Sequence, residues 1–190
     1  RGVFEFAMSG GRSPWAMLAI MGELEGMPWA ETELFQVDER VAPDGDESRN
    51  LTHLCPSLPE AARPRVRPMP VTASALDAAA DAYAGELPGA LDFVHLGLGP
   101  DGHTASLVPG DPILEVGDRR VALTGGEYQG SRRMTLTYPE LARARRILWL
   151  VTGAEKRDAL RALLARDPSI PAGRVEARDP LVLADEPAGG

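Results

Sequence analysis

The sequence predicts an α/β fold: a single domain, residues 1–190, with a mostly parallel, doubly wound sheet flanked by helices. Segments of strand character alternate along the chain with segments whose apolar residues recur at helical spacing. The apolar run at residues 147–151 is nearly continuous, which is typical of a strand buried on both faces of a parallel sheet. A length of 190 residues is that of one domain, for which about 100–200 residues is usual.

The first half of the chain begins with a short buried strand at residues 3–8, which ends at a glycine turn. Ser13 and Pro14 then indicate the N-cap and first turn of a helix. A second strand is expected at residues 33–37, followed by a polar loop over residues 38–50.

The second half starts with an alanine-rich helix over residues 73–87, for which Thr72 is the expected N-cap. Pro139 indicates a short helix, and Gly153 begins a turn into a helix that ends near Ala165. Further strands are expected at residues 91–98, 121–124, 134–137, 147–151 and 181–184.

Composition excludes several classes of protein. The formal net charge of −8 argues against nucleic acid as the main partner, because binding to a phosphate backbone needs a basic face. No apolar run approaches the roughly 18 residues of a membrane span. The single cysteine, Cys55, excludes a disulfide framework and a cysteine-rich zinc site, so we expect a cytoplasmic protein. The sequence does not indicate an oligomeric state.

Unusual residues follow several of the expected strands. In an open α/β sheet, ligands bind beyond the carboxyl ends of the strands, so these residues are expected to meet at one edge. The four segments concerned are residues 9–12, 38–40, 99–103 and 152–156.

The first and last of these segments favour an anion. Ser9, Gly10 and Gly11 would let backbone N–H groups approach a phosphate at a helix N-terminus. Lys156, the only lysine of the chain, lies in a first helical turn, where a cation is unfavourable unless an anion binds. Arg132 and Arg133 are either further phosphate ligands or surface ion-pair donors. An ordinary strand-to-helix turn and a solvated lysine are the alternatives for the first two features.

The third segment contains the best candidate for a catalytic base. His103 follows Asp101 by two residues in a glycine-flanked turn, so the carboxylate can orient the imidazole. A loop histidine without a role is the alternative. His95 lies in mid-strand and is expected to be a satisfied core residue, whereas His53 is expected to be a surface or helix residue near Pro56. No Gly-x-Ser-x-Gly elbow or cysteine–histidine pair is present, which favours water as the attacking group.

The run LGLGPDGHTASLVPG at residues 96–110 resembles the central motif of the 6-phosphogluconolactonases. The order of the other motifs agrees with that family, and the resemblance extends over nearly the whole chain. The matching segments are SGGRSP at residues 9–14, DER at 38–40, RMTLT at 133–137 and LVTGAEK at 150–156.

This resemblance implies hydrolysis of 6-phosphoglucono-δ-lactone to 6-phosphogluconate, in the oxidative pentose phosphate pathway, without a metal or an organic cofactor. It implies that His103 activates water, that Asp101 orients His103, and that Arg40 stabilises the lactone oxygen. The residues implied to bind the substrate phosphate are Ser9, Gly10, Gly11, Arg133 and Lys156.

The chain also departs from the family pattern. The family has a helix before the first strand, and this chain begins at Arg1 without one, so we expect an N-terminal helix to be missing. The family more often has a serine directly before the residue matching Asn50, and the last segment lacks an expected tryptophan.

Two other functions are considered. Glucosamine-6-phosphate deaminases or isomerases resemble Asp-Glu-Tyr where this chain has Arg40, and a non-catalytic sugar-phosphate sensor could share the fold.

Overall fold

The computed structural model describes residues 2–190 and contains a central six-stranded sheet in the order β4-β2-β1-β5-β8-β9. Every neighbouring pair in this sheet is parallel. The chain runs outward from β1 to one edge and then returns to fill the other side, so the direction of winding reverses between β1 and β5. The predicted doubly wound α/β fold is therefore confirmed. The strands are β1 (Phe4–Met8), β2 (Thr32–Gln36), β4 (Val66–Arg67), β5 (Phe93–Leu96), β8 (Arg146–Val151) and β9 (Pro180–Ala184).

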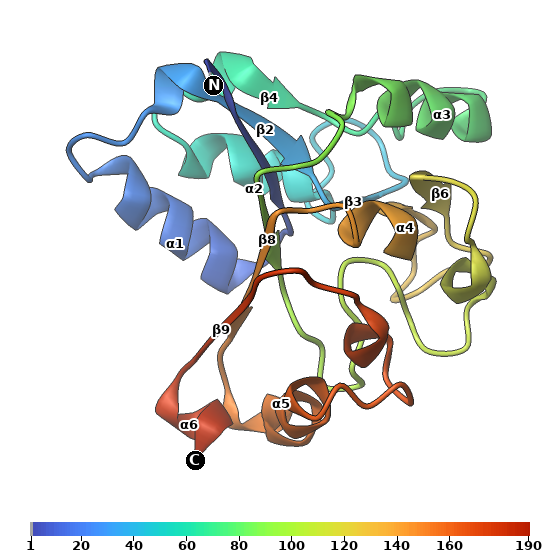
Figure 1. The fold of residues 1–190 in the computed structure, drawn as a ribbon. Helices are drawn as coiled ribbons and strands as arrows, with labels where there is room; N and C mark the ends of the chain where they lie inside the picture. Colours follow the sequence, from blue (N-terminus) through green and yellow to red (C-terminus); the bar gives the residue numbers. More distant parts are fainter. Residues whose placement is uncertain (1) are drawn as a thin grey trace.

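Helices lie on both faces of the central sheet (Figure 1). The α1 helix packs on one face, and α3 and α4 lie on the opposite side. The helices are α1 (Arg12–Gly22), α2 (Asn50–Leu54), α3 (Leu76–Glu86), α4 (Tyr138–Leu141), α5 (Arg157–Leu164) and α6 (Glu186–Gly189).

A second sheet of three strands was not predicted. It pairs β3 (Asp38–Arg40), β7 (Arg133–Leu136) and β6 (Val121–Leu123) in antiparallel fashion. Sequence analysis expected strands close to β6 and β7 but assigned residues 38–40 to a loop. That assignment is wrong, because a short, charged strand forms here through its pairing with a distant strand, and local propensity does not indicate that pairing.

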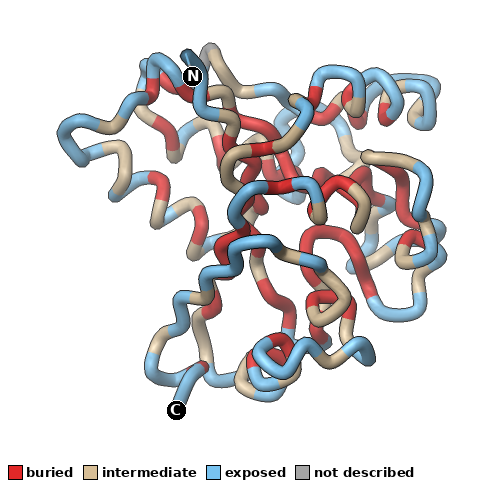
Figure 2. Tube along the Cα trace, in the orientation of Figure 1, coloured by how far each residue is buried: buried red, intermediate tan, exposed pale blue. Residues whose placement is uncertain are grey.

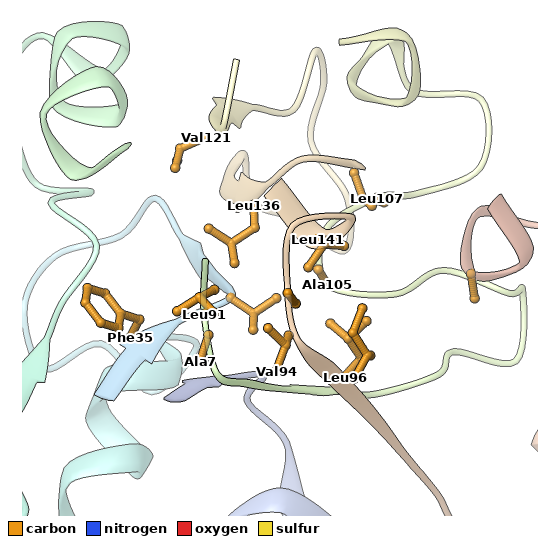
Figure 3. Packing of buried hydrophobic residues seen from close by; sticks show 14 of the residues in the cluster. Ala7, Phe35, Leu91, Val94, Leu96, Ala105, Leu107, Val121, Leu136 and Leu141 are labelled. Atoms are coloured by element: carbon orange, nitrogen blue, oxygen red, sulfur yellow. The ribbon is translucent and has the colours of Figure 1, made fainter. Parts of the chain in front are cut away.

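Two apolar clusters pack against the central sheet. Figure 2 shows buried residues concentrated along the central strands. Successive side chains of a strand point to opposite faces. In β1, Ala7 therefore joins the larger cluster, while Phe6 and Met8 join the smaller cluster beneath α1. Figure 3 shows Val94 and Leu96 of β5 within the larger cluster. The sheet is thus packed on both faces around β1 and β5.

Two predicted helix starts differ from the structure. The helix expected from residue 73 begins at Leu76, because Val71 is buried in the core and the Ala73 N–H closes a turn onto the Pro70 carbonyl. The α1 helix begins after Gly11, which has φ +132°, so Ser13 is not its N-cap.

His95 in β5 is fully buried, as predicted, but it is not satisfied: neither ring nitrogen has a hydrogen-bond partner among residues 2–190. Burial lowers the pKa of His95 to about 4, because the charged form would lose its hydration. The folded protein therefore holds fewer protons than the unfolded chain between about pH 6.5 and pH 4.

Stability should therefore fall as the pH drops through this window, by about 3 kcal/mol at pH 4 from His95 alone. The variant His95→Leu should lose less stability than the wild type between pH 7 and pH 4.5, as measured by urea unfolding at each pH. His53→Gln, which changes a partly exposed histidine, serves as the control. An equal pH dependence in His95→Leu and wild type would contradict the presence of a neutral, buried imidazole.

Candidate active site

Three candidate segments follow the carboxyl ends of β1, β5 and β8 in the central sheet, whereas Arg40 and Arg133 lie in β3 and β7 of the second sheet. Three contacts link segments that are distant in sequence. Gly10, after β1, packs against the side chain of Asn50, at the start of α2. Ser13 and Thr152 join their hydroxyl groups at 2.7 Å, which links the start of α1 to the loop after β8. Tyr128, before β7, contacts the loop after β5. These contacts join the loop after β1 to the loop after β8 and, through Asn50, to Arg40, while Tyr128 reaches the loop after β5 from the β6–β7 connection.

Asp101 and His103 form a hydrogen-bonded pair. His103 Nδ1 lies 2.6 Å from Asp101 Oδ1, and the His103 backbone N–H donates to the same oxygen at 3.2 Å. The His103 Nε2 atom has no hydrogen-bond partner among residues 2–190, and the side chain keeps 20% of its surface exposed. This geometry leaves Nε2 available to a ligand while Nδ1 is oriented by the carboxylate.

Glycines around this pair are required by space and by backbone angle. A Cβ atom on Gly99 would lie 2.0 Å from His103 Nδ1. Gly102 has φ +80°, and a Cβ atom there would lie 2.5 Å from Ile170. The turn therefore brings the imidazole directly over the backbone, which side-chain-bearing residues would prevent.

Asp101 is ionised in this setting. Partial burial opposes its charge, but hydrogen bonds from His103 and Tyr128 outweigh that effect and hold the pKa of Asp101 below its usual range. The carboxylate is therefore available as an acceptor over the pH range in which an imidazole changes its charge.

Tyr128 also belongs to the site, although the sequence did not predict it as a site residue. Its hydroxyl donates to Asp101 Oδ2 at 2.9 Å and lies 3.2 Å from His103 Nδ1. The guanidinium carbon of Arg133 lies 5.1 Å from the centre of its ring. A tyrosine in a glycine-rich stretch carries no local signal of such contacts, because they depend on how the β6–β7 connection folds over the loop after β5.

Arg40 is held by Asn50. The Arg40 guanidinium donates to Asn50 Oδ1, and Asn50 Nδ2 donates to the Asp38 backbone carbonyl at 2.9 Å. A Cβ atom on Gly10 would lie 1.8 Å from Asn50 Oδ1, so only glycine allows this approach. The structure thus gives Asn50, whose role the sequence did not indicate, a position between Arg40 and the loop after β1.

The carboxylate of Glu39 organises this part of the site. It is fully buried and accepts hydrogen bonds from the first two backbone N–H groups of α2, Asn50 at 2.7 Å and Leu51 at 2.8 Å. It also accepts from the Arg40 N–H and from Gln36 Nε2, each at 2.8 Å. A carboxylate at a helix N-terminus is stabilised by unpaired N–H groups and by the helix dipole.

Arg133 is a buried cation without a close carboxylate partner. Arg133 pairs with Arg40 in the β3–β7 register, and its Nη1 atom lies 4.0 Å from Asp38 Oδ2. Its Nη2 atom donates to the Tyr128 carbonyl and to Gln129 Oε1, both at 3.2 Å, and its Nε atom has no partner in residues 2–190. Desolvation lowers the pKa of Arg133, and a bound anion would offset that cost. Arg132, in contrast, is engaged with the Thr124 carbonyl at 3.0 Å.

Ser9 and Lys156 have free polar groups. Ser9 Oγ is buried without a partner in the described chain, and its backbone N–H donates to His95 O at 3.1 Å. Lys156 is half-buried at the N-cap of α5, and its side chain makes no hydrogen bond or ion pair within residues 2–190. No direct interaction joins Lys156 to Arg40 or Arg133. The Gly153 N–H is taken by the Asp185 carboxylate at 3.0 Å, so it is not open to a ligand.

Other kinds of site are not evident in the described residues. Within residues 2–190, no group of three or more His, Cys, Asp or Glu side chains is placed to hold a metal ion. A groove between α4 and α5, lined by Tyr138, Trp149 and Arg174 among others, contains none of the candidate residues. No helix in the described part of the chain is long and apolar enough to cross a membrane.

Residues 1–183 match the family described as glucosamine-6-phosphate isomerases/6-phosphogluconolactonase, and the chain belongs to this family. A 6-phosphogluconolactonase of Synechocystis is 36% identical over 210 residues, which cover 100% of this chain and 85% of the relative. A rabbit GDH/6PGL endoplasmic bifunctional protein is 38% identical over 171 residues, or 83% of this chain, and the match covers 22% of that longer protein.

Solved structures agree with the family. A 6-phosphogluconolactonase from Thermotoga maritima superposes with a TM-score of 0.86 at 26% identity, covering 97% of this chain and 85% of the other. A monomeric glucosamine-6-phosphate deaminase superposes with a TM-score of 0.83 at 19% identity, covering 97% and 86%. The deaminase similarity shows a shared fold.

The Glu39 carboxylate is open to a direct test. Glu39→Gln keeps the shape but replaces one acceptor oxygen by a donor that faces N–H groups. We expect a loss of about 1–3 kcal/mol in the free energy of unfolding at pH 7 and faster hydrogen exchange at the Asn50 and Leu51 amides. Glu127→Gln, at an exposed site, is the matched control and should change neither. Unchanged exchange at both amides in Glu39→Gln would refute the capping role.

Proposed function

We propose that this chain hydrolyses 6-phosphoglucono-δ-lactone to 6-phosphogluconate. The observation that carries the proposal is the Asp101–His103 pair, in which His103 Nε2 is free. Arg40 lies opposite Arg133 in the β3–β7 pair, and Tyr128 contacts both Arg133 and Asp101. The chain covers 85% of a 36% identical relative named as a 6-phosphogluconolactonase, which supports the same reaction.

The proposed chemistry begins with a water molecule hydrogen-bonded to His103 Nε2. As the water oxygen attacks the lactone carbonyl carbon, the imidazole takes one of its protons, and Asp101 stabilises the resulting imidazolium. Negative charge develops on the carbonyl oxygen, toward which the Arg40 guanidinium supplies N–H donors. The bond from that carbon to the ring oxygen then breaks, the imidazolium returns its proton to the ring oxygen, and the open-chain acid is released.

We assign the substrate phosphate to the glycine-rich loop after β1 together with Lys156 and Arg133. Gly10 and Gly11 offer backbone N–H groups, and Ser9 offers an unpartnered hydroxyl, since its own N–H already donates to His95 O. Lys156 and Arg133 add charge that no close carboxylate neutralises in the described chain. A dianionic phosphate would provide the missing partner for these groups.

An isomerase or deaminase activity is the competing function, because the family model includes it. Arg40 argues against this activity, because glucosamine-6-phosphate deaminases and isomerases resemble Asp-Glu-Tyr where this chain has Asp38-Glu39-Arg40. Two relatives that are 36% identical over 100% and 99% of this chain, from Synechocystis and Mycobacterium bovis, are named as 6-phosphogluconolactonases, which also favours hydrolysis.

The two functions are separated by one assay. Freshly generated 6-phosphogluconolactone should disappear faster with the purified protein than without it at the same pH, since the lactone also hydrolyses unaided. Glucosamine 6-phosphate should release no ammonia. Release of ammonia, or no acceleration of lactone hydrolysis, would overturn the proposal.

The role of His103 as general base predicts a large loss of turnover in His103→Ala. General base catalysis contributes roughly 10²–10⁴-fold, so kcat should fall by that factor while KM changes little. Wild-type activity should also fall on acidification, because only the neutral imidazole accepts a proton. A His103→Ala variant with wild-type kcat, after subtraction of the uncatalysed rate, would exclude this role.

The Lys156 side chain should affect the binding of substrate, measured by KM, more than the chemical step, measured by kcat. The phosphate is remote from the reacting carbon, so its contacts change little between bound substrate and transition state. We expect Lys156→Ala to raise KM at least several-fold with a smaller change in kcat, measured by initial rates over a range of lactone concentrations. Arg161→Ala removes an exposed cation from α5 and should leave both constants unchanged. A Lys156→Ala variant with the wild-type KM would exclude the phosphate contact.

A further inference from the structure

Tyr128 contacts both halves of the candidate site. Its hydroxyl bonds Asp101, and its ring faces both the His103 ring and the Arg133 guanidinium. We propose that Tyr128 is a positioning residue, whose hydroxyl fixes the Asp101–His103 pair for catalysis and whose ring holds Arg133 for substrate binding. This inference rests on the proposed lactone hydrolysis.

The hydroxyl completes the attachment of Asp101. Asp101 Oδ1 accepts from His103, and this contact alone would leave the carboxylate free to rotate in solvent, since the side chain is 37% exposed. The Tyr128 hydroxyl donates to the second oxygen, Oδ2, at 2.9 Å. Two-point attachment fixes the carboxylate plane, which favours the proton on His103 Nδ1 and leaves Nε2 as the base.

The ring acts on Arg133. The guanidinium carbon of Arg133 lies 5.1 Å from the centre of the Tyr128 ring, which is within the range of a cation–π interaction. The Arg133 Nη2 atom also donates to the Tyr128 carbonyl. Asp38, at 4.0 Å, supplies only a long ionic contact. The aromatic face therefore supports a desolvated guanidinium without neutralising its charge, so Arg133 remains able to bind an anion.

The turn that carries Tyr128 is itself well defined. Tyr128 N–H donates to Ser131 O at 3.0 Å, and the two residues between them, Gln129 and Gly130, have φ of +52° and +81°. Left-handed angles at both central positions are those of a tight hairpin turn. Upstream, the Asp111 carboxylate accepts from the Gly125 and Gly126 N–H groups at 2.9 and 3.1 Å. The loop thus holds the phenol at a fixed place over the site.

Two substitutions separate the hydroxyl from the ring. Tyr128→Phe removes only the hydroxyl, so kcat should fall roughly 3- to 10-fold, the effect of one hydrogen bond, with KM within about two-fold of wild type. Tyr128→Leu removes the ring as well, so KM should also rise roughly 2- to 10-fold. Glu127→Gln, the neighbouring exposed position, is the control and should behave as wild type. A wild-type kcat in Tyr128→Phe, or a wild-type KM in Tyr128→Leu, would overturn the corresponding half of the inference.

A readout without substrate separates this inference from the proposed function. The ¹⁵N resonances of the His103 ring report which nitrogen carries the proton. In Tyr128→Phe the Nδ1-protonated form of His103 should become less populated, whereas the rings of His53 and His95 should not change. If Tyr128→Phe alters the His103 ring resonances but the wild-type protein does not hydrolyse the lactone, the positioning role stands and the proposed function is wrong. An active enzyme whose His103 ring is unchanged in Tyr128→Phe would reject the positioning role.

Discussion

The buried carboxylate of Glu39 is the interaction on which the candidate site depends. It lies where three parts of the fold meet: Gln36 ends a central strand, Arg40 ends a strand of the small sheet, and α2 begins at Asn50. Each of these parts donates at least one hydrogen bond to the same carboxylate. A buried charge is tolerated only when it is fully hydrogen-bonded, so this junction has few alternative arrangements. The position of Arg40 beside Asn50 follows from it.

The distribution of charge at this edge accounts for an anion site in an acidic protein. The chain as a whole carries a formal charge of −8. Asp38 and Glu39 are buried, and their oxygens are engaged by internal donors such as Ser106, at 2.6 Å, and Asn50. Arg133 and Lys156 are left without close carboxylate partners in the described residues. The site therefore offers two cations, Arg133 and Lys156, that an anion could pair with, although the chain as a whole is acidic.

Local patterns were sufficient to predict the alternation of strands and helices, and the Asp101–His103 pair was predicted because a two-residue spacing in a tight turn fixes its geometry. The strand at Asp38–Arg40 was not predicted, since its stability comes from pairing with Arg133–Leu136, nearly a hundred residues later. Tyr128 was missed for the same reason. Its contacts with Asp101 and His103 depend on how two loops fold together, and a single sequence carries no local signal of that arrangement.

We propose that a single site binds the phosphate at the loop after β1 and presents the reacting carbon to His103. A crystal structure with bound 6-phosphogluconate, the product, tests this most directly. We expect phosphate oxygens within hydrogen-bond distance of Lys156, of the Ser9 hydroxyl and of the Gly10 and Gly11 backbone N–H groups, with the new carboxylate facing His103 Nε2 and Arg40. A product bound in the reverse orientation, or in the groove between α4 and α5, would contradict it.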